Sequence, residues 1–228
     1  MAIDGNKILV LAPEHNTGSS HDAIGAFRPE AAAFAKRHGV PKAQVVWIDN
    51  HLTKPAMRKT VLAEIEKTKV ANGGLEALVL CCHGWKDGIQ FGFTRANVGD
   101  LAKAISAVKD VRVVLYACST AQGEGGDDDA ATGGDGGFAD RLRDALCQEG
   151  AVNCQVDAHT TKGHTTWNPK VRRFQGMGSP YGGAGGFFIV SSTQKALYAK
   201  WKKAMKTTNL RYDFPFLTVA EIHAAIAG

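Results

Sequence analysis

The chain has 228 residues and a formal net charge of +5, with 44% hydrophobic and 8% aromatic residues. This length fits a single domain spanning residues 1–228, and the composition supplies a sizeable core built mainly of Ala, Val, Leu and Ile. No apolar stretch approaches the roughly 18 residues that crossing a bilayer requires. The polar start at residues 1–6 is too short for a signal peptide.

The charge and the cysteines indicate the compartment and the partners. Much of the positive charge lies in lysines between residues 195 and 206, where we expect a solvated helix face, since no nucleic-acid-binding motif accompanies them. Five cysteines, two of them adjacent, suit free thiols in a reducing compartment better than a disulfide framework. We therefore expect a soluble cytoplasmic protein that binds neither nucleic acid nor membranes. The sequence leaves its oligomeric state open.

Strands and helices alternate regularly along the chain. Strands are predicted at 7–11, 44–48, 75–82, 111–116, 154–157 and 187–190, and helices at 29–38, 54–67, 98–108, 138–147, 194–206 and 219–226. The strands are continuous apolar runs, as in sheets covered on both faces. The pattern therefore predicts an α/β fold with one open, mostly parallel, six-stranded sheet between helices. Gly39 predicts a helix end, and Thr218 with Glu221 predicts a capping box.

Two segments interrupt this alternation. Residues 122–137 are too rich in glycine to pack, and their acidic cluster begins at Asp127, Asp128 and Asp129. The cluster departs from the calcium-loop pattern at Ala131, which favours a flexible loop and leaves calcium binding or a processing site as alternatives. Residues 158–186 show little periodicity, and a loop of that length in a compact domain is usually functional.

Two buried-strand strings stop at reactive side chains. Residues 78–84 end in His83 and Gly84, and residues 113–120 pass through Ala117 to Cys118. Neighbouring parallel strands end at the same sheet edge, so an imidazole and a thiol would face one cleft there. A thiol with a neighbouring imidazole as its base is the least that catalysis by a cysteine nucleophile requires. Because Gly84 lacks a Cβ, a substrate carbonyl could reach an oxyanion hole formed by the Gly84 and Cys118 amides.

The residues around these strings have simpler expected roles. Cys81 and Cys82 precede the strand end and are expected to pack in the core, since adjacent strand residues point to opposite faces and cannot share a metal with His83. Residues 85–91 predict a small hairpin with an Asp-Gly turn.

A hydrophobic strand ending in His-Gly, followed by one ending in Ala-Cys, resembles the caspase-like cysteine peptidases of clan CD. The likeness covers residues 7–190, although the specific motif is confined to the two strand ends. It implies a three-layer caspase-like fold over the whole chain, with His83 as the catalytic histidine and Cys118 as the nucleophile. Tyr116 departs from the Gln of caspases and the Asp of clostripain-like enzymes.

The resemblance also implies a substrate pocket formed by loops after the first, fourth and fifth strands. Substrate-binding candidates there are His15, Asp157 and His159. Asp157 would suit a basic substrate side chain and Arg172 or Arg173 an acidic one, and the sequence leaves both open. His159 and His164 could join Asp157 in a zinc site, but no fourth ligand is identifiable, so no metal is expected.

These features predict a cysteine endopeptidase that hydrolyses polypeptides through a Cys118 acyl-enzyme, with His83 as general acid and base. No cofactor is expected, and calcium stays open as an activator.

One alternative is a non-catalytic caspase-like module that regulates or binds a partner. Another is a flavodoxin-like binding domain with a small-molecule site at the same edge. Retention of both His83 and Cys118 favours the enzyme. The absence of a glycine-rich phosphate motif after the first strand counts against a nucleotide binder.

Overall fold

The computed structural model describes residues 3–16, 22–106, 109–125, 132–179, 182–183 and 185–228. It contains a large central sheet and a two-stranded hairpin. In spatial order the large sheet consists of β2 (Val45–Ile48), β1 (Ile8–Pro13), β3 (Ala77–Cys81), β6 (Arg112–Tyr116), β8 (Gln155–His159), β9 (Val171–Gln175), β10 (Gly186–Phe188) and β7 (Thr132–Gly133). The helices are α1 (Phe27–His38), α2 (Lys54–Asn72), α3 (Val98–Ile105), α4 (Phe138–Gln148), α5 (Lys195–Thr207), α6 (Leu210–Asp213) and α7 (Val219–Ala227). Short 3₁₀ turns lie at Gly5–Lys7, Lys42–Gln44 and Phe214–Phe216.

The sheet has a parallel part and an antiparallel part. The neighbours from β2 through β1, β3 and β6 to β8 are all parallel. From β8 onward, β9, β10 and β7 each run antiparallel to the strand before them. When these five parallel strands alone are numbered in chain order, their spatial order is 2-1-3-4-5, which is common in doubly wound α/β folds. Their carboxyl ends all lie at one edge of the sheet.

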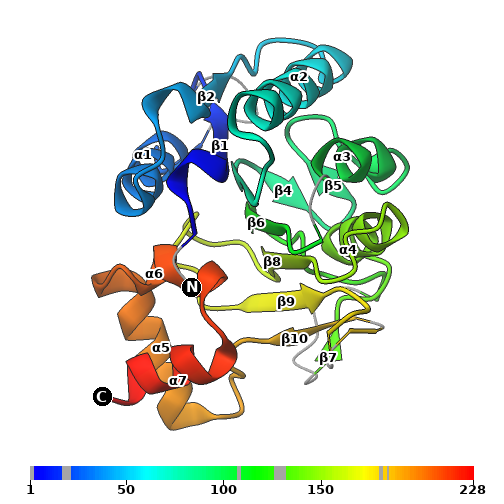
Figure 1. Ribbon diagram of the computed structural model, residues 1–228. Helices are drawn as coiled ribbons and strands as arrows, with labels where there is room; N and C mark the ends of the chain where they lie inside the picture. The colour runs from blue at the N-terminus through cyan, green and yellow to red at the C-terminus, as the bar shows by residue number, and fades with distance from the viewer. Residues whose placement is uncertain (1–2, 17–21, 107–108, 126–131, 180–181, 184) are drawn as a thin grey trace.

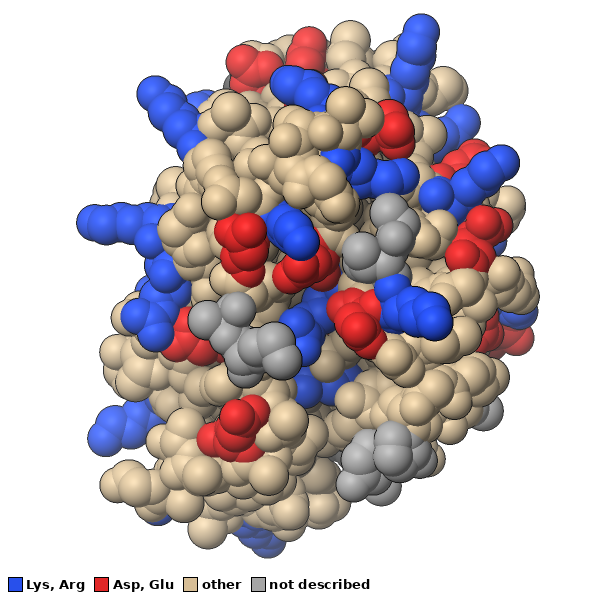
Figure 2. All heavy atoms as spheres, in the orientation of Figure 1, with Lys and Arg blue, Asp and Glu red and all other residues tan. Residues whose placement is uncertain are grey.

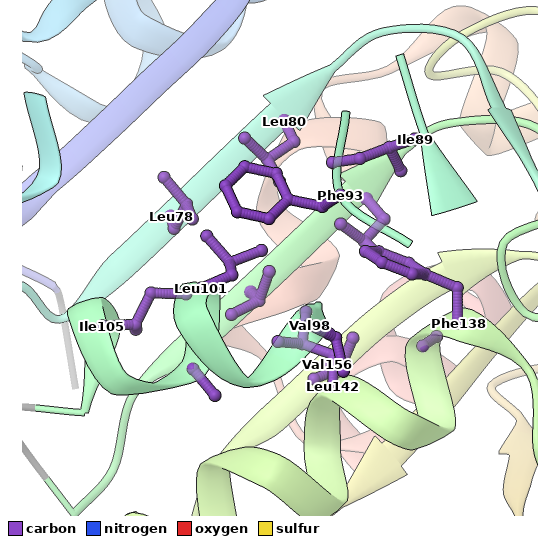
Figure 3. Close-up of a cluster of buried hydrophobic side chains, with 14 of the residues drawn as sticks. Leu78, Leu80, Ile89, Phe93, Val98, Leu101, Ile105, Phe138, Leu142 and Val156 are labelled. Carbon is purple, nitrogen blue, oxygen red and sulfur yellow. The ribbon is translucent and has the colours of Figure 1, made fainter. Parts of the chain in front are cut away.

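Helices cover both faces of this sheet, as Figure 1 shows. On one face, α2, α3 and α4 pack on the sheet. Figure 3 shows part of that core, with Leu101 of α3 beside Leu78 of β3 and Leu142 of α4 beside Val156 of β8. On the other face, α1 and the C-terminal helices α5, α6 and α7 bury a second cluster. Each strand therefore needs apolar residues on both sides, which explains the continuous apolar runs.

The predicted α/β class and mostly parallel sheet are confirmed, but the predicted number of strands is wrong. The sheet has eight strands because β7 and β9 also belong to it. Two adjacent arginines, Arg172 and Arg173, interrupt the apolar pattern of β9, yet both are 1% exposed. The predicted hairpin is present as β4 (Gly84–Trp85) and β5 (Gly88–Ile89), with Lys86 and Asp87 forming its turn.

Each predicted helix is present, although α2 extends to Asn72 rather than ending at residue 67, and the short helix α6 has no counterpart in the prediction. Gly39 ends α1 with a φ of 64°, and its N–H donates to carbonyls of the last turn. Thr218 and Glu221 form the expected capping box of α7. Helix α3 ends at Ile105 rather than residue 108, and residues 107–108 lie outside the described residues.

The glycine-rich segment 122–137 packs at both described ends, contrary to the prediction. The Glu124 N–H donates to the Asp135 carbonyl at 2.9 Å, and the Glu124 carboxylate pairs with Arg95 at 3.0 Å. Strand β7 then joins the sheet beside β10. Residues 126–131, which include the three consecutive aspartates and Ala131, lie outside the described residues. Flexibility and calcium binding there stay predictions.

Two surface properties bear on partners. The α5 lysines are exposed, as expected. On the face shown in Figure 2, basic side chains are interspersed with acidic ones, so this face does not carry a single sign of charge. In the described part of the chain, no helix combines the length and the apolar character needed to cross a membrane.

Candidate active site

His83 and Cys118 lie at equivalent positions beyond two neighbouring strands. Strands β3 and β6 are parallel, with Cys81 opposite Tyr116, and the Cys82 N–H donates to the Tyr116 carbonyl at 3.4 Å. Two further residues along each strand lead to His83 and to Cys118. Because side chains alternate with a period of two, both positions belong to the face on which Cys81 and Tyr116 pack.

Both residues line a single cavity of about 560 Å³. Its walls come from the segment before α1, from the carboxyl ends of β3, β6 and β8, and from the loop that precedes β9. The remaining lining residues are Asp22, Ala23, Ile24, Phe27, Tyr116, Ala117, His159, Lys162, Gly163, His164, Thr165, Trp167, Asn168, Pro169 and Lys206. The sheet edge predicted from the two strand ends is therefore hollowed into a site large enough for a substrate side chain.

Cys118 lies where the chain turns away from the sheet. Ser119, which follows it, has a φ of 58° and is the single non-glycine residue with positive φ within the described ranges. Such a backbone costs free energy for a residue with a Cβ, and in proteins it concentrates at functional turns. The half-buried Cys118 thiol donates a long, weak hydrogen bond to the Gly163 carbonyl at 3.7 Å.

Gly84 packs directly against this turn. A Cβ on Gly84 would lie 2.6 Å from Thr120 Cγ2, 2.8 Å from Ala117 Cβ and 2.9 Å from the Cys118 carbonyl oxygen. The residue must therefore be glycine for the two strand ends to approach so closely. The His83 carbonyl accepts the Gln90 N–H at 2.9 Å, so the alternation of antiparallel pairs leaves Gly84 at a position whose N–H points away from β5.

The protein holds the backbone and the ring of His83 in different ways. Gln90 anchors the backbone on both sides, since its side-chain oxygen also accepts the His83 N–H at 3.2 Å. The ring meets the edge of Phe27 at 4.9 Å between centroids, with planes 87° apart. Its Nε2 atom is buried and has no hydrogen-bond partner among the described residues. No hydrogen bond therefore joins this nitrogen to the Cys118 thiol, which bonds to the Gly163 carbonyl instead.

The loop from 160 to 169 forms a fixed wall. The Asn168 side chain donates to the Thr161 carbonyl at 2.9 Å and accepts the Lys170 N–H at 3.0 Å. The rings of His164 and Trp167 stack at 3.9 Å between centroids, 9° from parallel. Trp167 Nε1 is buried and lacks a partner among the described residues. The wall thus contains a stacked pair of rings and an N–H donor that is unbonded among the described residues.

His159 ends β8 and lines the same cavity, as the expected substrate-binding role requires. It is 3% exposed, and burial lowers its pKa to about 4, so the ring is neutral near pH 7. The ring hydrogen-bonds to the Thr165 backbone, and its buried Nδ1 has no partner among the described residues. The cavity is therefore lined by a neutral histidine that has one unbonded ring nitrogen.

Asp157 is not among the lining residues of the cavity, so the structure does not bring it to the substrate side. It is 1% exposed and accepts two hydrogen bonds from Arg173, at 2.8 and 3.0 Å. Gln155 donates a third at 2.8 Å. Arg172 is also buried, with its guanidinium over the Phe188 ring at 4.1 Å and an N–H bonded to the Gly186 carbonyl. Neither the expected acid nor the expected arginines face the cavity.

His15 also lies outside the large cavity. It follows β1 and lines a smaller neighbouring cavity of about 180 Å³. Its ring stacks on His51 and lies near Asp49, and these three are the one potential metal-ligand cluster found within the described ranges. The zinc set considered from the sequence is not assembled, because Asp157 is held in its ion pair.

Cys81 and Cys82 pack in the core as expected. They belong to the cores on opposite sheet faces, and burial raises the pKa of both thiols. Cys154 is buried with a raised pKa, and its sulfur lies 3.8 Å from that of the half-buried Cys147.

Several lining residues have no signal in the sequence. Asp22 precedes α1 and Phe27 is its first residue, and nothing in their spacing links them to the two strand ends. Lys206 reaches the cavity from the basic face of α5, where only a solvated face is expected. Comparison with known proteins finds no matching family model, no matching curated protein and no matching solved structure.

Proposed function

We propose that this protein is a caspase-like cysteine endopeptidase. The observation that carries the proposal is that His83 and Cys118 extend neighbouring parallel strands in register and line one cavity. A thiol and an imidazole that line one cavity, the latter with an unbonded Nε2, can form a thiolate–imidazolium pair once they come within hydrogen-bond reach, and that pair supplies both the nucleophile and the acid for acyl transfer.

In the proposed reaction, the Cys118 proton passes to His83 and the sulfur attacks the scissile carbonyl carbon. The weak thiol contact to Gly163 must first break, which costs little. The oxygen of the tetrahedral intermediate accepts hydrogen bonds from the Gly84 and Cys118 N–H groups. His83 then protonates the leaving amine as the C–N bond breaks. Water, deprotonated by His83, hydrolyses the thioester to release the carboxylate product.

The cavity supports an uncharged substrate side chain in the residue before the scissile bond. A cation buried there would need a carboxylate at hand, but Asp157 is committed to Arg173. Among the described residues that line the cavity, Asp22 is the one carboxylate, and it already accepts the Phe27 and Ile24 N–H groups at 2.7 and 3.2 Å. An anion could meet Lys162 or Lys206, but both lysines are exposed, and an ion pair in solvent contributes little.

The unbonded ring nitrogens of the cavity favour a polar but neutral side chain. The unbonded Trp167 N–H is a donor, whereas the unbonded Nδ1 of neutral His159 is an acceptor because the other ring nitrogen donates to the Thr165 backbone. Together they suit a neutral side chain with both an acceptor and a donor, such as an amide.

The test is digestion of a diverse peptide library, with products identified by mass spectrometry. We expect cleavage by the wild type and by Cys147→Ala, and none by Cys118→Ala or His83→Ala, at unchanged melting temperature. Cleavage by Cys118→Ala at the wild-type rate would overturn the nucleophile assignment. A wild type that cleaves nothing would favour a non-catalytic module instead.

The substrate preference is tested separately with peptides that differ only before the cleaved bond. We expect Gln, Met or Phe there to be cleaved about tenfold or more faster than Arg, Lys, Asp or Glu. A preference for Arg or Lys would show that Asp22 pairs with a basic substrate side chain. A preference for Asp or Glu would show that Lys162 or Lys206 pairs with an acidic one. Either result would overturn the neutral pocket while leaving the peptidase intact.

A further inference from the structure

A second cluster of reactive side chains lies at the ends of β1 and β2. These parallel strands pair with Pro13 opposite Ile48, and the Glu14 N–H donates to the Ile48 carbonyl at 2.8 Å. His15 follows β1, and Asp49 and His51 follow β2. The cluster therefore stands on two adjacent strand ends rather than on one loop. This supports a defined position for each side chain.

Distances within the cluster are close to those of a metal site. Asp49 Oδ1 lies 3.6 Å from His15 Nε2 and 3.9 Å from His51 Nδ1. One ligand atom from each of the three residues lies within 4.8 Å of the other two. Ligands bound tetrahedrally to zinc at about 2.0–2.2 Å are about 3.4 Å apart. The three atoms are thus only slightly farther apart than in a zinc site, so a short approach combined with reorientation of a ring would bring them to bonding distance.

Backbone contacts hold the ligands in place. The Asp49 oxygen that faces both histidines also accepts the His51 N–H at 2.9 Å, and the Asn50 side chain accepts the His15 N–H at 2.8 Å. Such hydrogen bonds to a ligand carboxylate and to the chain around a ligand histidine orient metal sites in other proteins. Here they tie the two loops together before any ion binds.

From this geometry we propose that His15, Asp49 and His51 bind a divalent transition-metal ion of the zinc class. Two imidazoles and one carboxylate are a donor set that zinc accepts, with water or Glu14 as the fourth ligand. Glu14 Oε2 lies 3.9 Å from His15 Nε2. None of the three cluster residues lines the larger cavity, so this site is separate from the proposed active site.

Ion binding must change the arrangement of the two rings. They stack at 4.4 Å between centroids, 5° from parallel. A metal lies in the plane of each imidazole that binds it, so two parallel rings cannot share one ion through their ring nitrogens. One ring must turn, and His51, whose side chain is 58% exposed, has the room. Loss of the stack is therefore a specific signature of metal binding at this site.

The experiment uses the metal-stripped full-length Cys118→Ala variant, because the Cys118 thiol is itself a potential zinc ligand. Zinc chloride is titrated by calorimetry, and the histidine ring signals are followed by NMR. We expect one ion per chain, with the largest shifts at His15 and His51. Changing either histidine to Ala, or Asp49 to Asn, should weaken binding by about tenfold or more.

His223→Ala is the matched control, since this half-buried histidine bonds the Ile189 carbonyl away from the cluster. Its zinc affinity should equal that of the parent variant. Absence of zinc binding, or binding unchanged in both His15→Ala and His51→Ala at unaltered melting temperature, would overturn the site. Because the parent lacks Cys118, either result leaves the proposed peptidase activity to be judged on its own.

Discussion

Gly84 lies against the carbonyl oxygen of Cys118, with room for a hydrogen atom but none for a methyl group. The closest three atoms to a Cβ at this position would all be within 2.9 Å, and they belong to the turn that carries the thiol. The spacing between the two strand ends is thus set by the smallest side chain available.

Gly84→Ala should lower peptide cleavage by about a hundredfold, because moving the Cys118 turn even slightly misplaces the nucleophile. Gly99→Ala in α3 is the control, since a Cβ there meets nothing within 4 Å, and it should retain full activity. Both rates come from the same peptide assay. A Gly84→Ala enzyme as active as the wild type would show that this close contact does not position the site.

Cys118 should be the thiol that iodoacetamide alkylates first. It is half-buried at the cavity, whereas Cys81 and Cys82 are buried with raised pKa values and hold few thiolates. Peptide mapping after brief labelling measures the order. Cys147, the other half-buried thiol, is the internal comparison, and labelling of Cys147 before Cys118 would contradict the assignment.

Asp157→Asn should destabilise the fold without changing substrate preference. Removing one partner of a buried ion pair leaves Arg173 uncompensated and costs about 3–5 kcal/mol. Asp213→Asn, which breaks the more exposed pair with Arg37, should cost only about 0–1 kcal/mol. Urea unfolding measures both. A change in the preferred peptide with no loss of stability would return Asp157 to the substrate pocket.

His159 should make the folded state sensitive to acid. Its pKa is about 4 in the folded protein and about 6.5 when unfolded, so the unfolded chain binds a proton first as the pH falls. Above about pH 6.5 the ring is neutral in both states and does not lower the stability. As the pH falls from there towards about 4, the free energy of unfolding decreases, and the loss reaches about 2–3 kcal/mol near pH 4.5. Urea unfolding of His159→Gln at about pH 7 and about pH 4.5 should show a shallower loss than the wild type. Equal losses would place the ring in a solvated environment.

The sequence was sufficient to predict the features that depend on local pattern. Apolar runs predicted the six strands between helices, and the abrupt ends of two of them predicted where His83 and Cys118 lie. Strand β9 was missed because Arg172 and Arg173 read as polar, while the partners that allow their burial come from elsewhere in the chain. Asp157 was misplaced for the same reason, since its ion pair with Arg173 becomes visible only when β8 and β9 are side by side.

Long-range neighbours explain the remaining differences. No spacing rule connects Phe27 with His83, or His15 with His51. Each of these ring contacts forms between segments that only the tertiary fold brings together at the sheet edge. The position of His15 beside β2, rather than in the large cavity, likewise follows from strand order. Tertiary packing, not propensity, determines these placements.

The most direct measurement is capture of Cys118 by a peptidyl acyloxymethyl ketone with an uncharged residue next to the reactive carbon. Attack by the sulfur forms a thioether and expels the carboxylate, so mass spectrometry locates the adduct. The account predicts a single adduct on Cys118 in the wild type and none in His83→Ala, whose Cys118 still reacts with iodoacetamide. An adduct on another cysteine, or equal capture in His83→Ala, would contradict it.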